Sequence, residues 1–131
     1  MKILIVDDEI TALTKMKVLL SSYGDCTLST NMGQALQLCQ KAIRSGIPFD
    51  IITIDIQLGN DNGHDLLENI NQMELRERTT PAKKFMVTAS STKENLVKAY
   101  SKGCDGFIVK PVKRDDLEQK MLSLGYTKRN P

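Results

Sequence analysis

The sequence has few cysteines, no long hydrophobic run and no excess of charge of either sign. Its three cysteines, Cys26, Cys39 and Cys104, are widely spaced, which argues against a disulfide framework or a zinc site and favours buried thiols in a reducing cytoplasm. The 18 basic and 16 acidic side chains give a formal charge of +2, which does not predict direct nucleic-acid binding. The apolar N-terminal run ending at Asp7 is too short for a signal peptide or a membrane span, so we expect no membrane insertion.

The sequence also shows no repeat, low-complexity tract or linker. A chain of 131 residues without such a division favours one domain. At this length about 70% of the unfolded surface becomes buried, so the domain needs no disulfide or metal to hold it together.

Short apolar runs alternate with segments in which apolar residues recur at helical spacing. The runs predict five strands, at residues 2–6, 26–30, 50–55, 85–88 and 107–109, each followed by a helix. Ser91-Thr92-Lys93-Glu94 fits a capping box at the start of the fourth helix. The alternation predicts an α/β fold, a parallel sheet with helices on both faces. Among the few topologies that right-handed crossovers leave open is the flavodoxin-like (βα)5 three-layer sandwich, with strand order 2-1-3-4-5.

Acidic side chains follow two of these strands at the point where each strand ends. In the order 2-1-3-4-5, strands 1 and 3 are neighbours, so Asp7, Asp8 and Asp55 converge at one edge of the sheet. Thr88 and Lys110 end strands 4 and 5 at the same edge. Ligands of open α/β sheets bind at this carboxyl edge. The sequence therefore places a candidate site there.

Three converging carboxylates repel one another, and a divalent cation relieves the repulsion. Oxygen ligands suit Mg²⁺, with Mn²⁺ as the alternative ion, and the sequence offers no His/Cys set for zinc. A carboxylate beside the ion can act as a nucleophile and form an acyl phosphate. We assign this role to Asp55, the acid that ends the central strand, with Lys110 and Thr88 stabilising the phosphoryl oxygens.

Taken together, these residues resemble the motifs of bacterial response-regulator receiver domains. The resemblance covers about residues 2 to 124, and the matching segments are Asp7-Asp8, Asp55, Gly63, Thr88-Ala89, 103–107 and Lys110-Pro111. We expect a receiver domain over residues 1–125, a C-terminal tail over residues 126–131 and no output domain in this chain.

The resemblance implies a cytoplasmic phosphorelay protein of a two-component system. A sensor histidine kinase or a histidine phosphotransfer protein would donate a phosphoryl group from phosphohistidine to Asp55. Asp8, Asp55 and the backbone carbonyl of Gln57 would bind Mg²⁺ directly, and Asp7 would act largely through a water molecule. Thr88 and Lys110 would bind the phosphoryl group.

The resemblance also implies a conformational switch. Thr88 would move toward the phosphoryl group and Phe107 would turn inward, reshaping the face formed by helix 4, strand 5 and helix 5. That face would contact a downstream protein target or an output domain, and it is a candidate surface for a homodimer. In the family the Lys110–Pro111 bond is typically cis. Gln57 and Ser90 occupy positions that tune phosphoryl lifetime, and because neither is a carboxylate we expect slow hydrolysis.

One departure from the family concerns the segment after the acceptor. Leu58-Gly59 stands where receiver domains often carry Met-Pro. Glycine frees φ and lacks the rigid ring, so we expect a mobile loop over residues 59–63. The site should persist, because the carbonyl of Gln57 remains available.

Several of these residues also have ordinary explanations when each is considered alone. Asp7-Asp8 is a common acid pair at a helix N-terminus, Thr88 a strand residue and Lys110 a solvated edge charge. Only the ordered set favours the site. Outside the set, we expect the lone His64, at a helix start, to have a solvated side chain. We expect the same of four basic residues, Arg76, Arg78, Lys83 and Lys84. Residues 127–131 should form a frayed terminus.

Other function classes remain open. A phosphate-independent interaction module, or pseudo-receiver, is the main alternative. An aspartyl-phosphate phosphohydrolase would need a second acid two residues after Asp55, where this chain has Gln57. A flavin-binding electron carrier would need a Ser/Thr/Gly-rich loop where this chain has Asp7-Asp8-Glu9. We therefore expect no enzyme activity beyond the domain's own phosphoryl transfer and autodephosphorylation.

Overall fold

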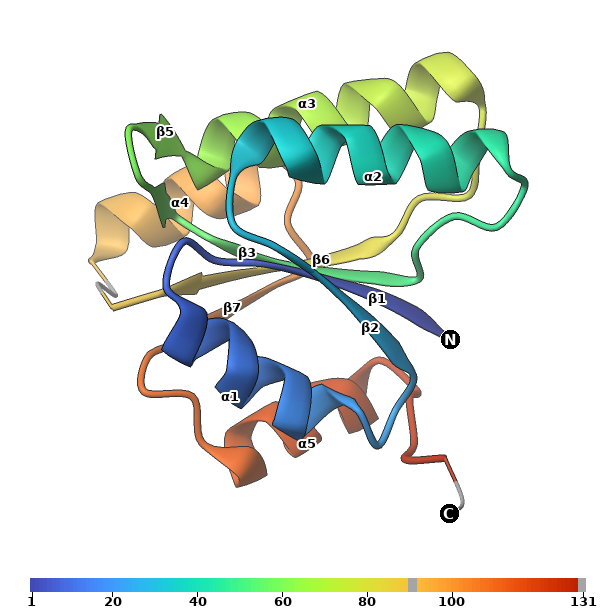
Figure 1. Cartoon of the computed structure of the whole chain (residues 1–131). Helices are drawn as coiled ribbons and strands as arrows, with labels where there is room; N and C mark the ends of the chain where they lie inside the picture. The colour runs from blue at the N-terminus through green and yellow to red at the C-terminus, as the bar shows by residue number, and fades with distance from the viewer. Residues whose placement is uncertain (90–91, 130–131) are drawn as a thin grey trace.

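The structure is a computed structural model that describes residues 1–89 and 92–129. A five-stranded parallel sheet runs through its centre in the order β2-β1-β3-β6-β7 (Figure 1). The strands are β1 (Lys2–Val6), β2 (Asp25–Ser29), β3 (Ile51–Asp55), β6 (Lys83–Thr88) and β7 (Gly106–Val109). The helices are α1 (Ile10–Leu20), α2 (Met32–Arg44), α3 (Gly63–Glu77), α4 (Lys93–Ser101) and α5 (Arg114–Ser123).

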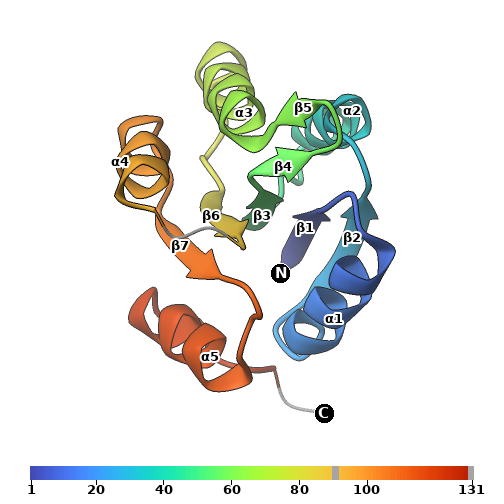
Figure 2. The same cartoon turned by 90° about the vertical axis from the view of Figure 1, so that its left-hand side faces the viewer.

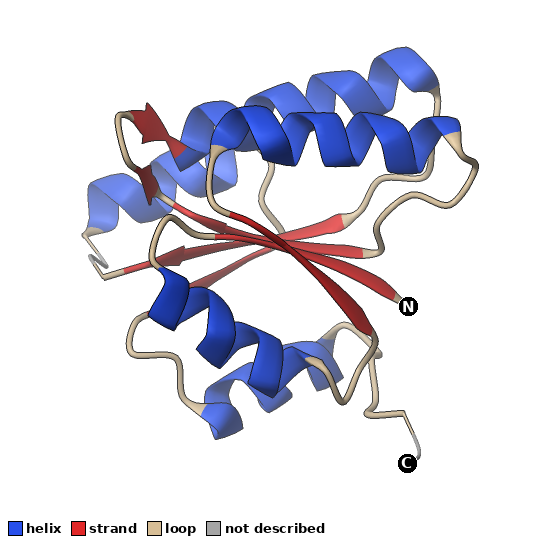
Figure 3. Cartoon of the chain, in the orientation of Figure 1, coloured by secondary structure: helices blue, strands red, loops and turns tan. Residues whose placement is uncertain are grey.

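Helices cover both faces of the sheet, which confirms the predicted flavodoxin-like sandwich (Figure 3). Viewed along the strands, α2, α3 and α4 lie on one side and α1 and α5 on the other (Figure 2). Two separate hydrophobic cores fill the spaces between the layers. Central strand β3 is buried along its whole length, as expected for a strand covered on both faces. Within the residues that the structure describes, no helix is long and apolar enough to cross a bilayer.

The segment expected to be a mobile loop, residues 59–63, includes the turn and the second strand of a small antiparallel hairpin. Strands β4 (Gln57–Leu58) and β5 (Asp61–Asn62) pair across a two-residue turn, Gly59-Asn60. The φ angle is positive at Gly59, +61°, and not at Asn60, which is the pattern of a type II′ turn with glycine at its first central position. Leu58 is buried in the core below. Glycine here therefore permits a regular turn.

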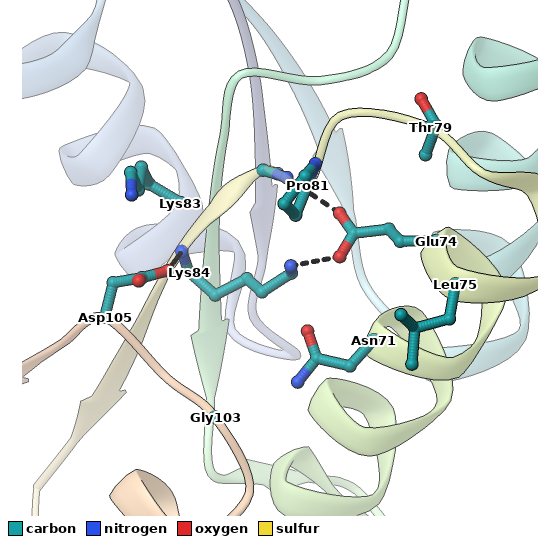
Figure 4. A pocket seen from close by; sticks show the side chains of 10 residues that line it. Asn71, Glu74, Leu75, Thr79, Pro81, Lys83, Lys84, Gly103 and Asp105 are labelled. Atoms are coloured by element: carbon teal, nitrogen blue, oxygen red, sulfur yellow. Dashed lines mark hydrogen bonds and ion pairs between the residues drawn. The ribbon is translucent and has the colours of Figure 1, made fainter.

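Strand β6 begins two residues earlier than the sequence predicted, and it therefore includes Lys84. We expected a solvated side chain, and that prediction is wrong: Lys84 is buried, and its ammonium pairs with the buried carboxylate of Glu74 on α3 (Figure 4). The other carboxylate oxygen of Glu74 accepts the backbone N–H of Ala82 at 2.7 Å. This partnership between two elements lets β6 begin at Lys83, ahead of its apolar run.

The start of α4 and the C-terminal tail also differ from what the sequence predicts. The N-cap of α4 is Thr92, whose hydroxyl accepts the Asn95 N–H at 3.3 Å, whereas Ser91 lies outside the described residues. The C-terminal tail is not frayed as far as residue 129. The Arg129 N–H donates to the carbonyl of Ser22 at 2.7 Å, and its guanidinium contacts Asp25 at 3.2 Å. The tail therefore packs back over the turn between α1 and β2.

Candidate functional site

Three carboxylates meet at the carboxyl edge of the sheet, as the sequence predicted. Asp7 and Asp8 follow β1, Asp55 ends the neighbouring strand β3, and one oxygen from each lies within 4.8 Å of the others. Asp7 and Asp55 are buried, while Asp8 is exposed. The cluster is thus open to solvent on one side and enclosed by the sheet on the other.

Lys110, which follows β7, reaches across this edge to two of the acids. Its Nζ lies 2.8 Å from Asp7 Oδ2 and 3.2 Å from Asp55 Oδ2. Burial alone would lower the pKa of Lys110, but the two carboxylates outweigh burial and raise that pKa. The other oxygen of Asp7 accepts the Glu9 N–H at 3.0 Å. Both oxygens of Asp7 are therefore engaged by the protein itself.

Asp55 is a buried acid with a raised pKa. Burial is the largest cause, and the charge of Asp7 adds to it, so that the pKa of Asp55 rises from 3.8 to about 6. The ammonium of Lys110 and the N–H of Gln57, 3.3 Å from Asp55 Oδ1, oppose this rise without cancelling it. Burial and the charge of Asp7 therefore outweigh the support that Lys110 and the Gln57 N–H give to the charged form of Asp55.

A pocket of about 250 Å³ opens above Asp55. Thr88 and Lys110 line it, as predicted for groups that would contact a phosphoryl oxygen, together with Asp8, Glu9, Gln57, Gly59 and Ala89. Ser90, the second expected lifetime-tuning residue, lies outside the described residues. Phe107, at the expected switch position, is buried in the core on the side of α4. The Lys110–Pro111 bond is cis, which confirms that prediction.

The backbone around Asp55 explains why Gly63 follows the hairpin. A Cβ atom at Gly63 would lie 2.1 Å from the carbonyl oxygen of Asp55, so only glycine fits there. The Gly63 N–H donates to the carbonyl of Ile56 at 2.6 Å. Because hydrogen-bonded and non-hydrogen-bonded pairs alternate in an antiparallel ladder, the next pair, Gln57 and Asn62, directs its carbonyls outward. The hairpin therefore does not consume the carbonyl of Gln57.

These groups fit a hard divalent cation. Three carboxylates and one ammonium leave a formal charge of −2, and all donors at the edge are oxygens. Such a cation would favour the charged form of Asp55 and so oppose the burial and the repulsion from Asp7 that raise its pKa. Asp8, Asp55 and Gln57 line the pocket and Asp7 does not, so the carboxylates of Asp8 and Asp55 and the carbonyl of Gln57 are the candidate ligands.

His64 follows Gly63 at the start of α3, and the expectation of a solvated side chain there is wrong. His64 is 1% exposed, and among the described residues neither ring nitrogen has a hydrogen-bond partner. Burial, followed by the charge of Lys98, lowers the pKa of His64, and the side chain of Asn95 exerts a smaller opposing influence. Its position three residues before buried Leu67 is the signal in the sequence for this burial.

A second, larger pocket of about 340 Å³ lies at the opposite end of the sheet, beside the α3–β6 connection (Figure 4). Its wall holds two acids and two lysines: Glu74 and Lys84, which pair with each other, and Asp105 and Lys83. Because these four formal charges sum to zero, whereas the acidic edge has an excess of carboxylates, the acidic edge is the better candidate for chemistry.

The chain is thus a doubly wound α/β domain with three acids and a lysine at the carboxyl edge of its sheet, the edge where ligands of such sheets bind. The chain belongs to the response regulator receiver domain family, whose sequence pattern matches residues 3–122. It is thus a receiver domain of a two-component response regulator. Chemotaxis protein CheY-3 of Vibrio cholerae is 34% identical over 123 residues, covering 92% of this chain and 88% of that protein.

Other relatives are much longer than this chain. The alginate biosynthesis transcriptional regulatory protein AlgB of Pseudomonas syringae is 32% identical over 117 residues, covering 88% of this chain and 24% of that protein. Hybrid signal transduction histidine kinase L of Dictyostelium discoideum is 27% identical over 124 residues, 95% of this chain and 7% of that protein. This chain therefore spans a small part of these first relatives.

Solved structures agree with the fold. A CheY-like receiver domain from Methanospirillum hungatei has a TM-score of 0.76 at 30% identity, covering 94% of this chain and 91% of that chain. The complex of CheX, CheY, BeF3 and Mg from Borrelia burgdorferi gives a TM-score of 0.80 at 23% identity, covering 96% of this chain and 90% of that chain.

Asp8 is bound by the β4–β5 turn, a contact that the sequence does not predict. The N–H of Gly59, in the β4–β5 turn, donates to Asp8 Oδ2 at 3.0 Å. The signal that could have revealed the turn is the pair Gly59-Asn60, since glycine at the first position of a two-residue connection is typical of a hairpin.

Proposed function

We propose that Asp55 accepts a phosphoryl group from phosphohistidine in a Mg²⁺-dependent reaction. The observation that carries this proposal is the excess negative charge around a buried acid whose pKa is raised to about 6, beside a lysine and an open pocket. A carboxylate oxygen of Asp55 attacks phosphorus, the bond from phosphorus to the imidazole nitrogen breaks, and its electron pair stays on that nitrogen. The product is an aspartyl phosphate.

Each group at the edge has a part in this transfer. Asp8, Asp55 and the Gln57 carbonyl would hold the ion, and Mn²⁺ has the same ligand preferences. A bound divalent cation supplies positive charge next to the transferring oxygens. Lys110 and Thr88 bind the phosphoryl oxygens, and Asp7 orients Lys110 through their 2.8 Å contact.

A protein donor suits the surface beside the pocket. An apolar hollow of about 370 Å³ adjoins Lys110 and is lined by Ala12 and Met16 of α1 and by Pro111 and Val112 after β7. A sensor histidine kinase or a histidine phosphotransfer protein can bury apolar side chains there while presenting its phosphohistidine to Asp55. The three free thiols fit a reducing compartment, the cytoplasm.

The output surface of the proposed switch is the face of α4, β7 and α5. Val97 and Tyr100 of α4 and Val109 of β7 are exposed apolar residues on these elements. Movement of Thr88 toward a phosphoryl group and inward rotation of Phe107 would alter this face, which then contacts a protein target, an output domain or a second copy of the chain. The domain acts on no separate substrate: it catalyses its own phosphoryl transfer and autodephosphorylation.

The test is the intact-protein mass after incubation with acetyl phosphate, with and without Mg²⁺. We expect a gain of about 80 Da, one phosphoryl group, that requires Mg²⁺ and is absent from Asp55→Asn. Absence of the adduct, with acetyl phosphate and also with a competent phosphohistidine donor, would support the alternative of a phosphate-independent pseudo-receiver. The slow hydrolysis expected from Gln57 is tested by following the same mass over time, and a half-life of seconds would contradict it.

A further inference from the structure

The β4–β5 hairpin is fixed to the rest of the domain at three points. The side chain of Leu58 is buried in the core. The side chain of Asn62 caps α3 by accepting the His64 N–H at 2.7 Å. The third point is the turn itself, where the Gly59 N–H donates to Asp8 Oδ2 at 3.0 Å. The turn is thus held against an acid that is 51 residues away in the sequence.

Asp8 depends on this contact more than the other two acids depend on theirs. Asp7 is buried and held by Lys110 and the Glu9 N–H, and Asp55 is buried and held by Lys110 and the Gln57 N–H. Asp8 is exposed, and the Gly59 N–H is the only donor that the described residues bring to its carboxylate. An exposed carboxylate without such a donor is free to rotate away from the cluster.

We propose that Gly59 is a positioning residue of the metal site: its main-chain N–H, presented by the hairpin, fixes the Asp8 carboxylate in the orientation that binds a divalent cation. One oxygen of Asp8 accepts the N–H, and the other remains available to the ion. This inference rests on the proposed Mg²⁺ site. Outer contacts that orient metal ligands commonly change metal affinity 10- to 100-fold when they are removed.

The backbone at position 59 explains the choice of residue. The φ of +61° suits glycine and is accessible to asparagine, but proline is fixed near −65°. Proline also has no N–H to donate. The Met-Pro that receiver domains often carry at these positions could not make this contact, so positioning of Asp8 by the turn is a property of this chain's own sequence.

The test is the Mg²⁺ affinity of the full chain, measured by isothermal titration calorimetry for three variants. Gly59→Pro removes the N–H, and we expect it to weaken Mg²⁺ binding about 10-fold or more. Gly59→Asn keeps the N–H and tolerates positive φ, and should stay within about threefold of the wild type. The matched control Asn62→Ala removes a different anchor of the hairpin and should leave the affinity unchanged while lowering thermal stability.

A measurement on the unaltered protein guards against a hairpin that fails to fold in Gly59→Pro. Because coupling between two sites is reciprocal, an N–H that organises Asp8 for Mg²⁺ must itself be stabilised when Mg²⁺ binds. Amide hydrogen exchange at Gly59 should therefore slow in saturating Mg²⁺, and exchange at Gly103, in the distant α4–β7 turn, should not change. Unchanged or faster exchange at Gly59 would overturn the proposal.

The outcomes separate this inference from the proposed function. A wild type that binds Mg²⁺ and is phosphorylated, with Gly59→Pro binding Mg²⁺ within threefold of it, overturns the positioning role alone. Equal losses in Gly59→Pro and Gly59→Asn would also overturn it, because the N–H would then not be the cause. A wild type that neither binds Mg²⁺ nor forms the adduct contradicts the proposed function and with it the positioning role.

Discussion

Removing the negative charge at position 55 should stabilise the metal-free domain. In the folded state the pKa of Asp55 is about 6, against 3.8 for an unperturbed aspartate. The folded protein therefore binds more protons than the unfolded chain between those values, and stability falls as pH rises from about 4 to about 6. A difference of about two pH units corresponds to about 3 kcal/mol at neutral pH. Asp55→Asn, which is neutral at every pH, escapes this penalty.

Urea denaturation in the presence of EDTA measures the effect. At pH 7 the midpoint of Asp55→Asn should exceed that of the wild type by about 1–2 M, and the difference should shrink toward zero as pH approaches 4. Asp61→Asn, which neutralises an exposed acid of the hairpin outside the cluster, should show no comparable change. An Asp55→Asn protein that is less stable than the wild type at pH 7 would refute the electrostatic reasoning.

Addition of Mg²⁺ should narrow this difference in stability between Asp55→Asn and the wild type. At 100 times its dissociation constant, a ligand that binds only the folded state stabilises it by about 2.7 kcal/mol. The wild type should gain about this amount, and Asp55→Asn, which lacks one ligand, should gain less. An equal gain in both proteins would place the ion away from Asp55.

Three other side chains lead to further tests by urea denaturation. Lys84→Met should lower the free energy of unfolding by about 3–5 kcal/mol, because it leaves the Glu74 carboxylate buried without its ammonium partner. The double variant Glu74→Leu/Lys84→Met should be far less destabilised. Equal losses of stability in the two proteins would contradict this. His64→Leu should raise stability by about 1–3 kcal/mol, since it removes a buried polar ring without a partner among the described residues. The pKa of His64 is lower in the folded state than its usual 6.5, so protonation of His64 at acid pH favours unfolding. The wild type should therefore lose stability as pH falls below 6.5, and His64→Leu should lose less. Arg78→Gly should raise stability by about 1 kcal/mol, because Arg78 holds a φ of +54° at the end of α3, and an unchanged midpoint would count against strain there.

The fold and the acidic edge could be predicted because their signals are local. Continuous apolar runs mark strands that are covered on both faces, and Asp7, Asp55 and Lys110 stand directly after such runs. Once the strand order is fixed, the ends of the strands must meet at one edge. The resemblance to a family added the switch roles of Thr88 and Phe107, which no spacing in the sequence defines.

The remaining features depend on partners that the sequence does not reveal. Lys84 is a charged residue next to an apolar run, and its burial is possible only because Glu74 comes from another element. Gly59 indicates flexibility when considered alone, and the contact that holds its turn involves Asp8, far away in the chain. Arg129 likewise contacts Asp25 across the domain. Such long-range pairs appear only in the folded structure.

The most direct test of the central claim is to locate the phosphoryl group. Reduction of the acetyl phosphate-treated protein with borohydride converts an aspartyl phosphate to homoserine, and peptide sequencing by mass spectrometry finds the residue. The account predicts homoserine at position 55, formed only when Mg²⁺ is present during phosphorylation. Homoserine at Asp8, Asp61 or another acid, with position 55 unmodified, would contradict it.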